Sequence, residues 1–421
     1  MKNKVNLKKV SDVVAEVLIE EKVSHVFAIS GGASLHLIHS LADNKNIQYI
    51  CNHNEQACAM AADGYSRVSG KTGVAVTTSG PGATNLITGI CCSYYDSIPS
   101  LFITGQVSTM RMKGDTGVRQ IGFQETPIVD IAEEITKYAY TIVDPEEIKY
   151  QLQKALHIAK SGRPGPVLID IPDDLQRQLV DPLKLKNFQA PAAQELPHLK
   201  NSLQDTMDSI MNSKRPILIA GWGVHLSDTE AEFLKFAESF NIPIALTWGA
   251  ADLIPFDHDL YVGTFGTHGN RHANFAVQNA DLIISLGSRL DTKSTGSPIN
   301  TFARDARKIM IDIDINELNK FQYFDLKFDQ LIHCDLKDFF NNFSKLEPTK
   351  DTCNNLEWLK QINKWKHQFI SFDDKKGIAT TKVNPYNFVD SISNNLKGNE
   401  QIFIDTGCSI AWFMQSLRVK D

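Results

Sequence analysis

Several features that would place a protein in a special class are scarce or absent in these 421 residues. No apolar stretch is long enough for a signal peptide or a membrane span, because charges interrupt even the basic N-terminal segment every few positions. The net charge is −6, from 43 basic and 49 acidic residues, and no basic block marks a surface for nucleic acid or lipid. We therefore expect no nucleic acid and no membrane as partners.

Cysteine is present, but without a pattern typical of a metal site or a disulfide framework. The seven cysteines form no CxxC pair: Cys51, Cys58, Cys91, Cys92, Cys334, Cys353 and Cys408. Their odd number and apolar surroundings are typical of reduced thiols in a core. The sequence thus predicts mostly buried thiols, including Cys91 and Cys92, and a cytoplasmic location. We predict no metal ligands, and we expect the isolated histidines His268 and His272 to lie in loops.

The common phosphate-binding motifs are missing as well. The stretch TTSGPGATN, Thr77 to Asn85, runs from a strand pattern into a Gly-Pro-Gly loop. It lacks the third glycine of GxGxxG and the GK[ST] of a P-loop, so a nucleotide phosphate site is the weaker interpretation. Two others remain: glycines that let the backbone approach a flat ligand, or a tight strand-to-helix turn.

What the sequence does contain is a repeated alternation of apolar runs and helical patterns. The apolar runs are HVFAIS, IQYICN, GVAVTTS, SLFITGQ and GPVLIDIP, and then RPILIAGWG, IPIALTW, ADLIISLGS and KIMIDID. Such runs, separated by amphipathic helices, are typical of parallel sheets covered on both faces. The predicted fold class is α/β, with two consecutive doubly wound parallel-sheet domains and the start of a third of the same type.

Shifts in composition divide the chain into five parts. We expect an N-terminal domain over 1–182, a linker over 183–200, a central domain over 201–345, a second linker over 346–380 and the start of a C-terminal domain over 381–421. The last part carries one helix pattern, NPYNFVDSISNNL, and one strand pattern, QIFIDTG. One helix and one strand cannot bury a core, so we expect this third domain to be cut short.

Glu55 raises the first question about function, because it stands before an alanine-rich segment suited to close packing, in HNEQACAMAADGYSRVSG. In one interpretation Asn54 caps a helix and Glu55 interacts favourably with the helix dipole. In the other, Glu55 holds or shares a proton with a ligand. The residue alone leaves both interpretations open.

Seven motifs in order carry a resemblance to a known family: ISGGAS, NHNEQACAMAADGYSR, TTSGPGATN, SIPSLFITGQV, GFQETPIVD, ITKYA and SGRPGPVLIDIP. Together they resemble the N-terminal, pyrimidine-binding domain of thiamine-diphosphate enzymes of the acetolactate synthase group. The segments WGAADLIPFDHDLYVGTFGTHGNRHANFAVQNADLIISLGSRLDTKSTG and IMIDIDINELNK resemble the middle domain of the same group. The resemblance covers nearly the whole chain.

The resemblance implies roles for individual residues. Glu55 falls where the family's activating glutamate hydrogen-bonds N1′ of the cofactor's aminopyrimidine, and Gln124 is implied as a second catalytic residue. The other residues implied near thiamine diphosphate are Gly31, Gly32, Pro81, Asn85 and Gln106, and those implied at the substrate are Ala33, Phe123 and Gln124. For Gln106 and Gln124 a hydrogen bond that merely holds a loop is the alternative.

The resemblance also implies two further cofactors. The family's middle domain holds FAD in acetolactate synthases, although related enzymes keep that domain without flavin. The matching residues are Arg163, Gly266, His268, Gly269, Arg289, Asp314 and Asp335; arginines and glycine backbone suit a pyrophosphate, and an aspartate at a strand end suits a ribose hydroxyl. Mg²⁺, which anchors the cofactor's diphosphate, is bound in the family by a C-terminal GDG motif that does not occur in this sequence.

The implied activity is decarboxylation of a 2-oxo acid such as pyruvate and transfer of the acyl unit to a second carbonyl, as in branched-chain amino acid biosynthesis. The complete protein is implied to be a homodimer or homotetramer, and we expect this chain alone to be inactive. The alternatives are a 2-oxo acid decarboxylase, a keto-sugar-modifying relative in polysaccharide synthesis, and a non-catalytic scaffold chain.

The sequence departs from the family in ways that bear on the acceptor. Asp173 stands where many acetolactate synthases have lysine, and Asn54 stands where the family usually has histidine. The segment STMRMKGDTGVRQIGFQE is also longer than the usual connection. The reversed charge at Asp173 suggests an acceptor other than pyruvate or 2-oxobutyrate.

Overall fold

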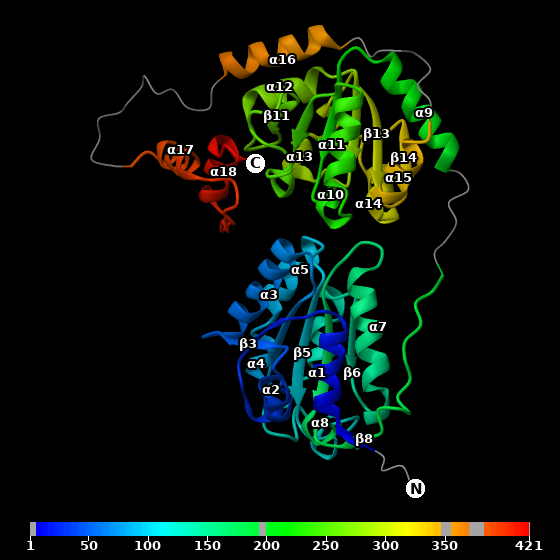
Figure 1. Ribbon diagram of the computed structural model, residues 1–421, viewed down its shortest axis with the longest axis vertical. Coiled ribbons are helices and arrows are strands. Elements are labelled where there is room, and N and C mark those ends of the chain that lie inside the picture. The colour runs from blue at the N-terminus through cyan, green and yellow to red at the C-terminus, as the bar shows by residue number, and fades with distance from the viewer. Residues whose placement is uncertain (1–5, 193–198, 347–354, 370–382, 421) are drawn as a thin grey trace. The chain divides into compact units, whose positions relative to one another are not determined.

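The computed structural model describes residues 6–192, 199–346, 355–369 and 383–420 (Figure 1). The chain divides into two compact units, Met1–Ala193 and Gln194–Asp421. Each unit is built around one parallel six-stranded sheet, as the apolar runs predict. The predicted α/β fold class is therefore confirmed.

The first unit has the strand order β3-β2-β4-β5-β7-β6. The strands are β2 (His25–Ala28), β3 (Gln48–Cys51), β4 (Gly73–Thr77), β5 (Ser100–Gln106), β6 (Tyr138–Thr141) and β7 (Val167–Pro172). A small antiparallel pair joins β1 (Lys8–Lys9) to β8 (Leu179–Val180). Strands β4, β5 and β7 are buried along their whole length, which explains why each appears as an uninterrupted apolar run in the sequence.

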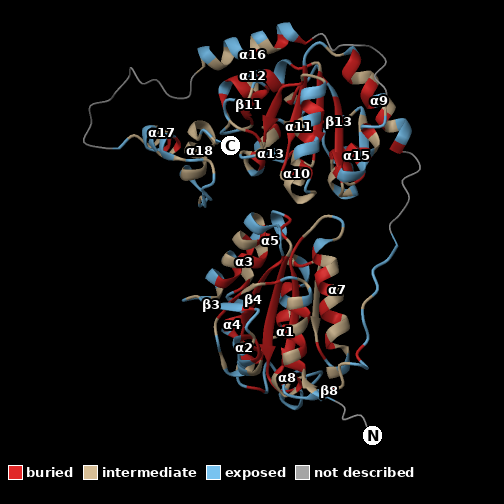
Figure 2. Ribbon diagram, in the orientation of Figure 1, coloured by how far each residue is buried: buried red, intermediate tan, exposed pale blue. Residues whose placement is uncertain are grey.

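Helices cover both faces of this sheet, so its strands lie in a buried layer between them (Figure 2). One face packs against α1 (Val10–Glu20), α2 (Leu35–Ala42) and α7 (Ile148–Lys160). The other packs against α3 (Glu55–Ser69), α4 (Pro81–Thr84), α5 (Ile87–Tyr95) and α6 (Ile128–Ala132). A short helix, α8 (Asp173–Gln176), follows β7.

The second unit has the strand order β11-β10-β9-β12-β13-β14. The strands are β9 (Pro216–Ala220), β10 (Ile244–Leu246), β11 (Tyr261–Thr264), β12 (Leu282–Leu286), β13 (Arg307–Asp312) and β14 (Gln330–His333). One face packs against α9 (Leu199–Asn212), α10 (Gly223–Leu226), α11 (Glu230–Ser239) and α15 (Leu336–Phe343). The other packs against α12 (Arg271–Asn279), α14 (Ile315–Asn319) and α16 (Leu356–Gln368), with α13 (Thr292–Thr295) nearby in the chain.

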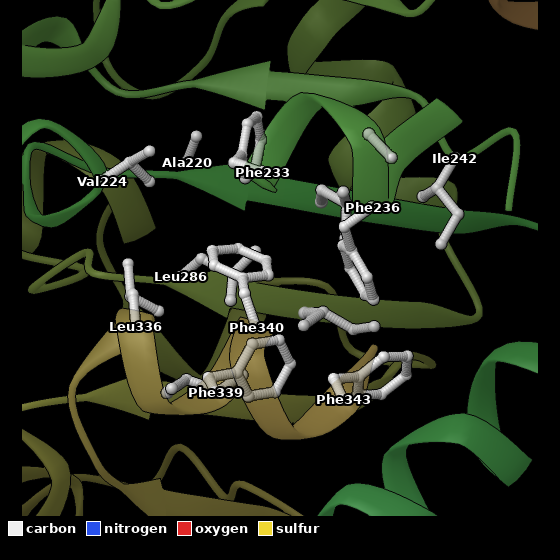
Figure 3. Close-up of a cluster of buried hydrophobic side chains, with 14 of the residues drawn as sticks. Ala220, Val224, Phe233, Phe236, Ile242, Leu286, Leu336, Phe339, Phe340 and Phe343 are labelled. Carbon is white, nitrogen blue, oxygen red and sulfur yellow. The ribbon is translucent and has the colours of Figure 1, made fainter. Parts of the chain in front are cut away.

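Aromatic rings fill much of the first of these faces, where α11 meets α15 (Figure 3). The ring of Phe236 on α11 meets the rings of Phe339, Phe340 and Phe343 on α15, with centroids 5.0–5.9 Å apart. The three α15 phenylalanines recur at the spacing of one helical face, which is what places all of them against α11 and the sheet.

The C-terminal third of the chain differs from the prediction in two places. The expected linker 346–380 contains helix α16, whose Trp358 and Ile362 pack into the core, while residues 347–354 and 370–382 lie outside the described residues, as do 193–198 of the first linker. The helix expected in NPYNFVDSISNNL is α17 (Pro385–Asn395), followed by α18 (Cys408–Ser416). The strand expected in QIFIDTG was wrong: residues 401–405 have no regular secondary structure and pair with no described strand.

The cysteines also differ from expectation. All those in the described part of the chain are free, but only Cys58 and Cys334 are buried, and the prediction that Cys91 and Cys92 lie in the core was wrong. Cys353 lies outside the described residues. His272 lies on α12 and is buried, so its expected place in a loop was wrong as well. No helix among the described residues is long and apolar enough to cross a membrane.

Candidate functional site

Glu55 lies at the first residue of α3, immediately after the turn that follows β3. The side chain of Asn54 caps the helix by accepting a hydrogen bond from the backbone N–H of Gln56, at 2.8 Å, as predicted. Asn85 Nδ2 donates to Glu55 Oε2 at 2.9 Å, which fixes the carboxylate from the neighbouring loop. In the described part of the chain Glu55 Oε1 accepts no hydrogen bond, and the residue is only partly buried. One carboxylate oxygen is therefore held and the other is available to a ligand.

The Gly-Pro-Gly loop passes directly beside this carboxylate. A methyl group added to Gly82 would lie 3.6 Å from Glu55 Oε1 and 2.6 Å from Thr78 Cγ2. A methyl group added to Gly31 would meet the same Thr78 Cγ2 at 2.4 Å, whereas one added to Gly32 would meet nothing within 4 Å. Gly31 and Gly82 thus allow close packing around Thr78, while Gly32 borders open space.

Thr78 connects these loops, and it was not among the residues that the sequence predicted for the site. Its Oγ1 accepts a hydrogen bond from the backbone N–H of Ala33 at 3.1 Å. Its methyl group is the atom that Gly31 and Gly82 approach. The only signal in the sequence was its position between a buried strand and the Gly-Pro-Gly loop.

Gln124 lies on the other side of the Gly-Pro-Gly loop. A methyl group added to Gly80 would come within 2.8 Å of Gln124 Cβ, so these two segments touch. Gln124 has φ +62°, a left-handed conformation that is strained for a residue with a side chain and that often marks functional sites. The neighbouring Phe123 is 84% exposed. The structure thus brings Gln124 to the loop that carries Pro81 and Asn85.

Gln106 is the last residue of β5, and its side-chain amide is hydrogen-bonded to neighbouring groups. Its Nε2 donates to the carbonyl oxygen of Thr126 at 2.8 Å and to Asp170 Oδ2 at 3.0 Å. Its Oε1 accepts from the backbone N–H of Val107 at 3.0 Å. Of the two roles that the sequence left open for Gln106, the loop-holding one is present here, and contact with a cofactor stays a prediction.

Asp173 does not stand as an isolated charge at the site. Its Oδ1 accepts a hydrogen bond from the hydroxyl of Ser108. The neighbouring Asp174 accepts from the backbone N–H and the hydroxyl of Thr109, at 2.9 and 2.7 Å. Both aspartates hold the start of the long loop that leads to Gln124, so the interpretation of Asp173 as a group that selects the acceptor by its charge receives no support.

Glu125 closes the other end of that loop. It accepts hydrogen bonds from the backbone N–H groups of Lys113, Ile121 and Gly122. Burial raises the pKa of Glu125, but these backbone donors and the Lys113 charge outweigh that effect and hold the pKa below its usual range. The loop is therefore held by carboxyl groups at both ends.

Gln176 is a further residue that sequence reasoning missed. Its Nε2 donates to the carbonyl oxygens of Ala33 and Ile171, both at 2.7 Å. It therefore fixes the turn that follows β2, where Gly31 and Gly32 lie. A buried glutamine in a charged stretch after β7 offers no sequence signal for this contact.

The second unit has a separate candidate site at the carboxyl edge of its sheet. Strands β10 and β11 lie on one side of β9, and β12, β13 and β14 lie on the other, so the order in which the chain adds parallel strands reverses between β9 and β12. Ligands of such sheets bind at this reversal point. A methyl group added to Gly221 would lie 2.2 Å from the carbonyl oxygen of Gly287, so the loops after β9 and β12 approach closely there.

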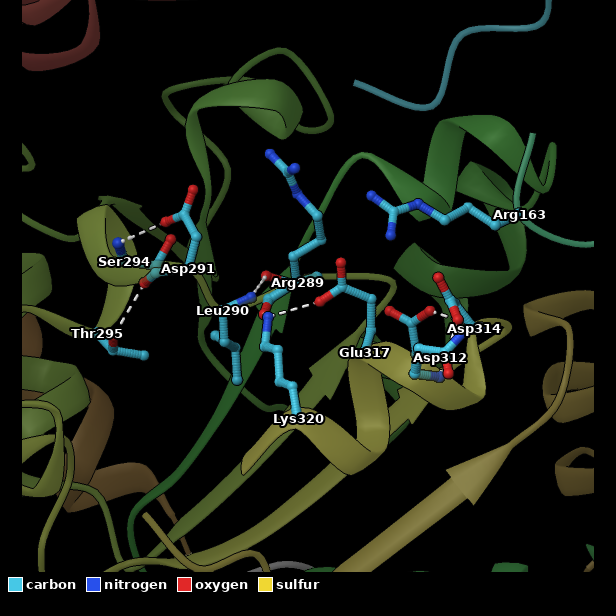
Figure 4. A network of polar contacts seen from close by, with 12 residues as sticks. Arg163, Arg289, Leu290, Asp291, Ser294, Thr295, Asp312, Asp314, Glu317 and Lys320 are labelled. Carbon is cyan, nitrogen blue, oxygen red and sulfur yellow. Dashed lines mark hydrogen bonds and ion pairs between the residues drawn. The ribbon is translucent and has the colours of Figure 1, made fainter. Parts of the chain in front are cut away.

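The residues expected to hold FAD divide between the two units. Arg163 belongs to the first unit, where its Nε donates to Ser97 Oγ at 2.8 Å. Arg289 follows β12, and its carbonyl oxygen accepts from Lys320, which also donates to Glu317 at 2.6 Å (Figure 4). Asp314 caps α14 and Asp335 caps α15, each by accepting a backbone N–H at 2.9 and 2.8 Å respectively. Both aspartates thus already have structural roles.

The loop after β11 carries the remaining expected FAD residues. Gly266 has φ +102°, and Asn274 holds both its backbone N–H and its carbonyl oxygen. The ring of His268 stacks on Trp248 with centroids 5.8 Å apart. A methyl group added to Gly269 would collide with the backbone of Phe265 at 2.5 Å. Asn274 is a site-shaping residue that the sequence did not single out. No cluster of three or more potential metal ligands occurs among the described residues.

Comparison with known proteins assigns both units. Residues 8–132 match the family described as thiamine pyrophosphate enzyme, N-terminal TPP binding domain, and residues 203–341 match thiamine pyrophosphate enzyme, central domain. A probable acetolactate synthase large subunit of Methanocaldococcus jannaschii is 35% identical over 426 residues, covering 98% of this chain and 69% of that protein. The acetolactate synthase large subunit of Lactococcus lactis is 34% identical over 413 residues, covering 96% and 68%.

The fold and these matches define a thiamine pyrophosphate enzyme, that is, a thiamine-diphosphate enzyme. Within that class the chain belongs to the acetolactate synthase family. Acetolactate synthase 2 of Nicotiana tabacum is 39% identical over 320 residues, covering 74% of this chain and 46% of the tobacco protein. The chain thus spans between just under half and about two thirds of the length of these three relatives.

Proposed function

We propose that this chain supplies the pyrimidine-binding half of an acetolactate synthase-like carboligase that acts on pyruvate or a similar 2-oxo acid. The observation that carries the proposal is the arrangement of Glu55: Asn85 holds Oε2, Oε1 is available, and the backbone of Gly82 lies beside it. A flat heterocycle with a ring nitrogen needs such a carboxylate edge and a neighbour without a side chain. The relatives' names support the carboligase activity.

Thiamine diphosphate, when bound, supplies the thiazolium carbon that adds to the 2-oxo acid and accepts the electrons left when CO₂ departs. The contribution of this chain is to hold and move a proton at the pyrimidine ring nitrogen through Glu55. Asn85 orients the carboxylate, and the strained Gln124 presents its side chain at the same loop, where we propose contact with the substrate. Gly32, next to open space, and Ala33 would border the ligand, and Phe123 would border the substrate.

For the second unit we propose a bound flavin nucleotide at the reversal point of its sheet. The close approach of Gly221 and Gly287 and the position of Arg289 after β12 suit a pyrophosphate. Gly266, His268 and Gly269 would line the same nucleotide, whereas the capping roles of Asp314 and Asp335 leave each with less acceptor capacity for a ribose. The absorption spectrum of the purified chain tests this part: flavin bands near 450 nm are expected, and an apoprotein that takes up no added FAD would refute it.

The chain carries no GDG motif, so we assign it no magnesium ligand. We propose a homodimer or homotetramer as the working assembly, a place in branched-chain amino acid biosynthesis and a cytoplasmic location, which the free exposed cysteines support.

Calorimetric titration of the chain with the aminopyrimidine fragment of thiamine tests the central claim. We expect binding to the wild type and at least tenfold weaker binding to Glu55→Gln, because the amide cannot take part in proton exchange with the ring nitrogen. Asn85→Ala should weaken binding severalfold. The matched control is Glu146→Gln, an exposed acidic residue that also lies in a first helical turn, which should bind as the wild type does.

A turnover assay then separates carboligation from its alternatives. The chain is incubated with pyruvate, thiamine diphosphate and Mg²⁺, with and without an added diphosphate-binding domain from the L. lactis relative. We expect 2-acetolactate only when that domain is present and Glu55 is intact. Acetaldehyde as the sole product would indicate a decarboxylase, and absence of both fragment binding and turnover would favour a scaffold chain.

A further inference from the structure

A buried carboxylate, Asp170, lies next to the candidate site without belonging to the predicted set. It is on β7, in register with Thr104 of β5 and Thr141 of β6, and is 1% exposed. Its Oδ1 accepts from the hydroxyl of Thr104 at 2.6 Å, and its Oδ2 accepts from Gln106 Nε2 at 3.0 Å and more weakly from Thr141 at 3.4 Å.

Burial of this group is unfavourable by itself. Burial raises the pKa of Asp170 to about 6, and the three neutral donors only partly oppose that effect. The helices on the same face of the sheet carry Asp63 and Arg67, which pair with each other at 2.6 Å, and Asp130, which is exposed. A carboxylate buried among neutral donors costs free energy, so we expect it to position the groups that donate to it.

Gln106 connects Asp170 to the loop that carries Gln124. The same Nε2 that donates to Asp170 donates its other hydrogen to the carbonyl oxygen of Thr126. With the carboxylate in place the amide cannot rotate without losing a charge-assisted hydrogen bond. Thr126 is two residues from Gln124, whose φ of +62° needs its neighbours to hold it.

We propose that Asp170 is a positioning residue that acts through Gln106 to fix residues 122–126, and with them the backbone of Gln124 beside the Gly-Pro-Gly loop. Its catalytic consequence rests on the proposed function, because Gln124 matters only if that site works as described. The hydrogen-bond relay itself does not depend on the proposed function.

Hydrogen exchange measured by mass spectrometry on the full chain tests the relay without any assay of activity. The probes are the amides of Ile121, Gly122 and Glu125, which are hydrogen-bonded within the loop. Asp170→Ala should speed their exchange about tenfold, as expected for the loss of one hydrogen bond to a charged group. Asp170→Asn should stay within threefold of wild type, because its Oδ1 still accepts from Gln106 while its amide donates to the Thr104 hydroxyl.

Two comparisons make the result specific. The double variant Asp170→Ala with Gln106→Ala should exchange no faster than the faster single variant, because both changes break the same relay. The matched control Asp174→Ala should speed exchange only over residues 107–112, where Asp174 holds Thr109. The proposal would be overturned if the loop amides of Asp170→Ala exchanged as fast as those of the wild type. It would also be overturned if the effects of Asp170→Ala and Gln106→Ala added in the double variant.

A second variant decides the matter if Asp170→Ala does not fold. Gln106→Glu places a second carboxyl group against Asp170. Each carboxyl has one hydrogen at most to donate, so the link from Asp170 to the carbonyl oxygen of Thr126 then needs both carboxyls protonated. Protection factors over 121–125 should therefore fall at least tenfold between about pH 4 and about pH 8. Adding Asp170→Asn to Gln106→Glu should move the midpoint of this fall to lower pH, because the second negative charge is gone, and an unchanged midpoint would exclude Asp170 as the partner.

Discussion

Among single residues, Thr78 connects the turn after β2 to the Gly-Pro-Gly loop. Its hydroxyl accepts the N–H of Ala33, and its methyl group fills the space that Gly31 and Gly82 leave. The adjacent Thr77 is fully buried, whereas Thr78 is only partly buried, and the Thr77 hydroxyl has no partner in the described part of the chain. Of these two neighbouring threonines, only Thr78 uses its hydroxyl.

We expect Thr78→Val to destabilise the first unit by about 1–3 kcal/mol, because it leaves the N–H of Ala33 without an acceptor at unchanged shape. Thr77→Val should be neutral or stabilising, since it removes an unsatisfied buried hydroxyl. Urea unfolding followed by far-ultraviolet circular dichroism measures both. Equal effects of the two substitutions would contradict the assignment of Thr78 as the connecting residue.

The pH response of the second unit should depend on His272. Burial lowers the pKa of His272 from 6.5 to about 4. The unfolded chain therefore takes up a proton between these values that the folded chain does not, so stability is present above pH 6.5 and is lost as the pH falls toward 4. The loss is on the order of 3 kcal/mol for this shift. His272→Gln should flatten the decline in the urea midpoint over this window, and an unchanged decline would assign it to other groups.

Residue roles were predictable from the sequence where they depend on neighbours in the chain. The cap at Asn54 and the placement of Glu55 at the start of α3 belong to this kind. Asp170 and Gln176 were not found, because their partners come from other strands and loops far away in sequence. A side chain's partner across a sheet depends on strand order, which a single sequence does not contain.

At the scale of elements, the crossing of α3 and α5 shows why the first of these helices is rich in small residues. A methyl group added to Gly89 on α5 would lie 2.3 Å from Ala59 Cβ on α3. Cys58, Ala59 and Ala62 are fully buried against this contact and the sheet. The close packing expected of the alanine-rich segment is confirmed.

Gly89→Ala should therefore separate the two helices and destabilise the first unit by about 1–3 kcal/mol, the usual cost of an added methyl group in a packed core. The control is Thr88→Ala, an exposed position on the same helix, which should change stability little. Since Glu55 begins α3, Gly89→Ala should also weaken binding of the aminopyrimidine fragment. Unchanged stability would mean that the crossing can relax at no cost.

Elements were predictable where burial on two faces gives an uninterrupted apolar run, as in β4, β5, β9 and β12. Three edge strands, β6, β11 and β14, were missed, because an edge strand has fewer neighbours and a weaker pattern. The segment 401–405 has the pattern of a strand but no described strand to pair with. Helix α16 was missed because its polar face dominates its composition.

At the scale of the molecule, the two units carry different optical reporters. All five tryptophans, Trp222, Trp248, Trp358, Trp365 and Trp412, belong to the second unit. Each unit has its own sheet and its own clusters of buried apolar residues. Fluorescence excited at 295 nm therefore follows the second unit alone.

We expect Phe339→Ala, which removes a fully buried ring from the α11–α15 cluster, to shift the fluorescence transition by about 3–5 kcal/mol. Gly89→Ala should leave that transition in place and shift only the circular dichroism signal of the first unit. Coincident shifts in both signals for both variants would show that the units unfold as one.

The hydrogen bond between Ser108 and Asp173 has a consequence for how this family diverges. A lysine at position 173 could not accept a hydrogen bond from the hydroxyl of Ser108, so the start of the loop would lose that contact. We therefore expect the two positions to change together: sequences that keep aspartate at 173 should keep a hydroxyl donor at 108, and sequences that change one should change the other. If these positions co-vary among homologues, Asp173 belongs with the loop that it holds. The length and sequence of that loop, and not the sign of one charge, would then distinguish this branch of the family.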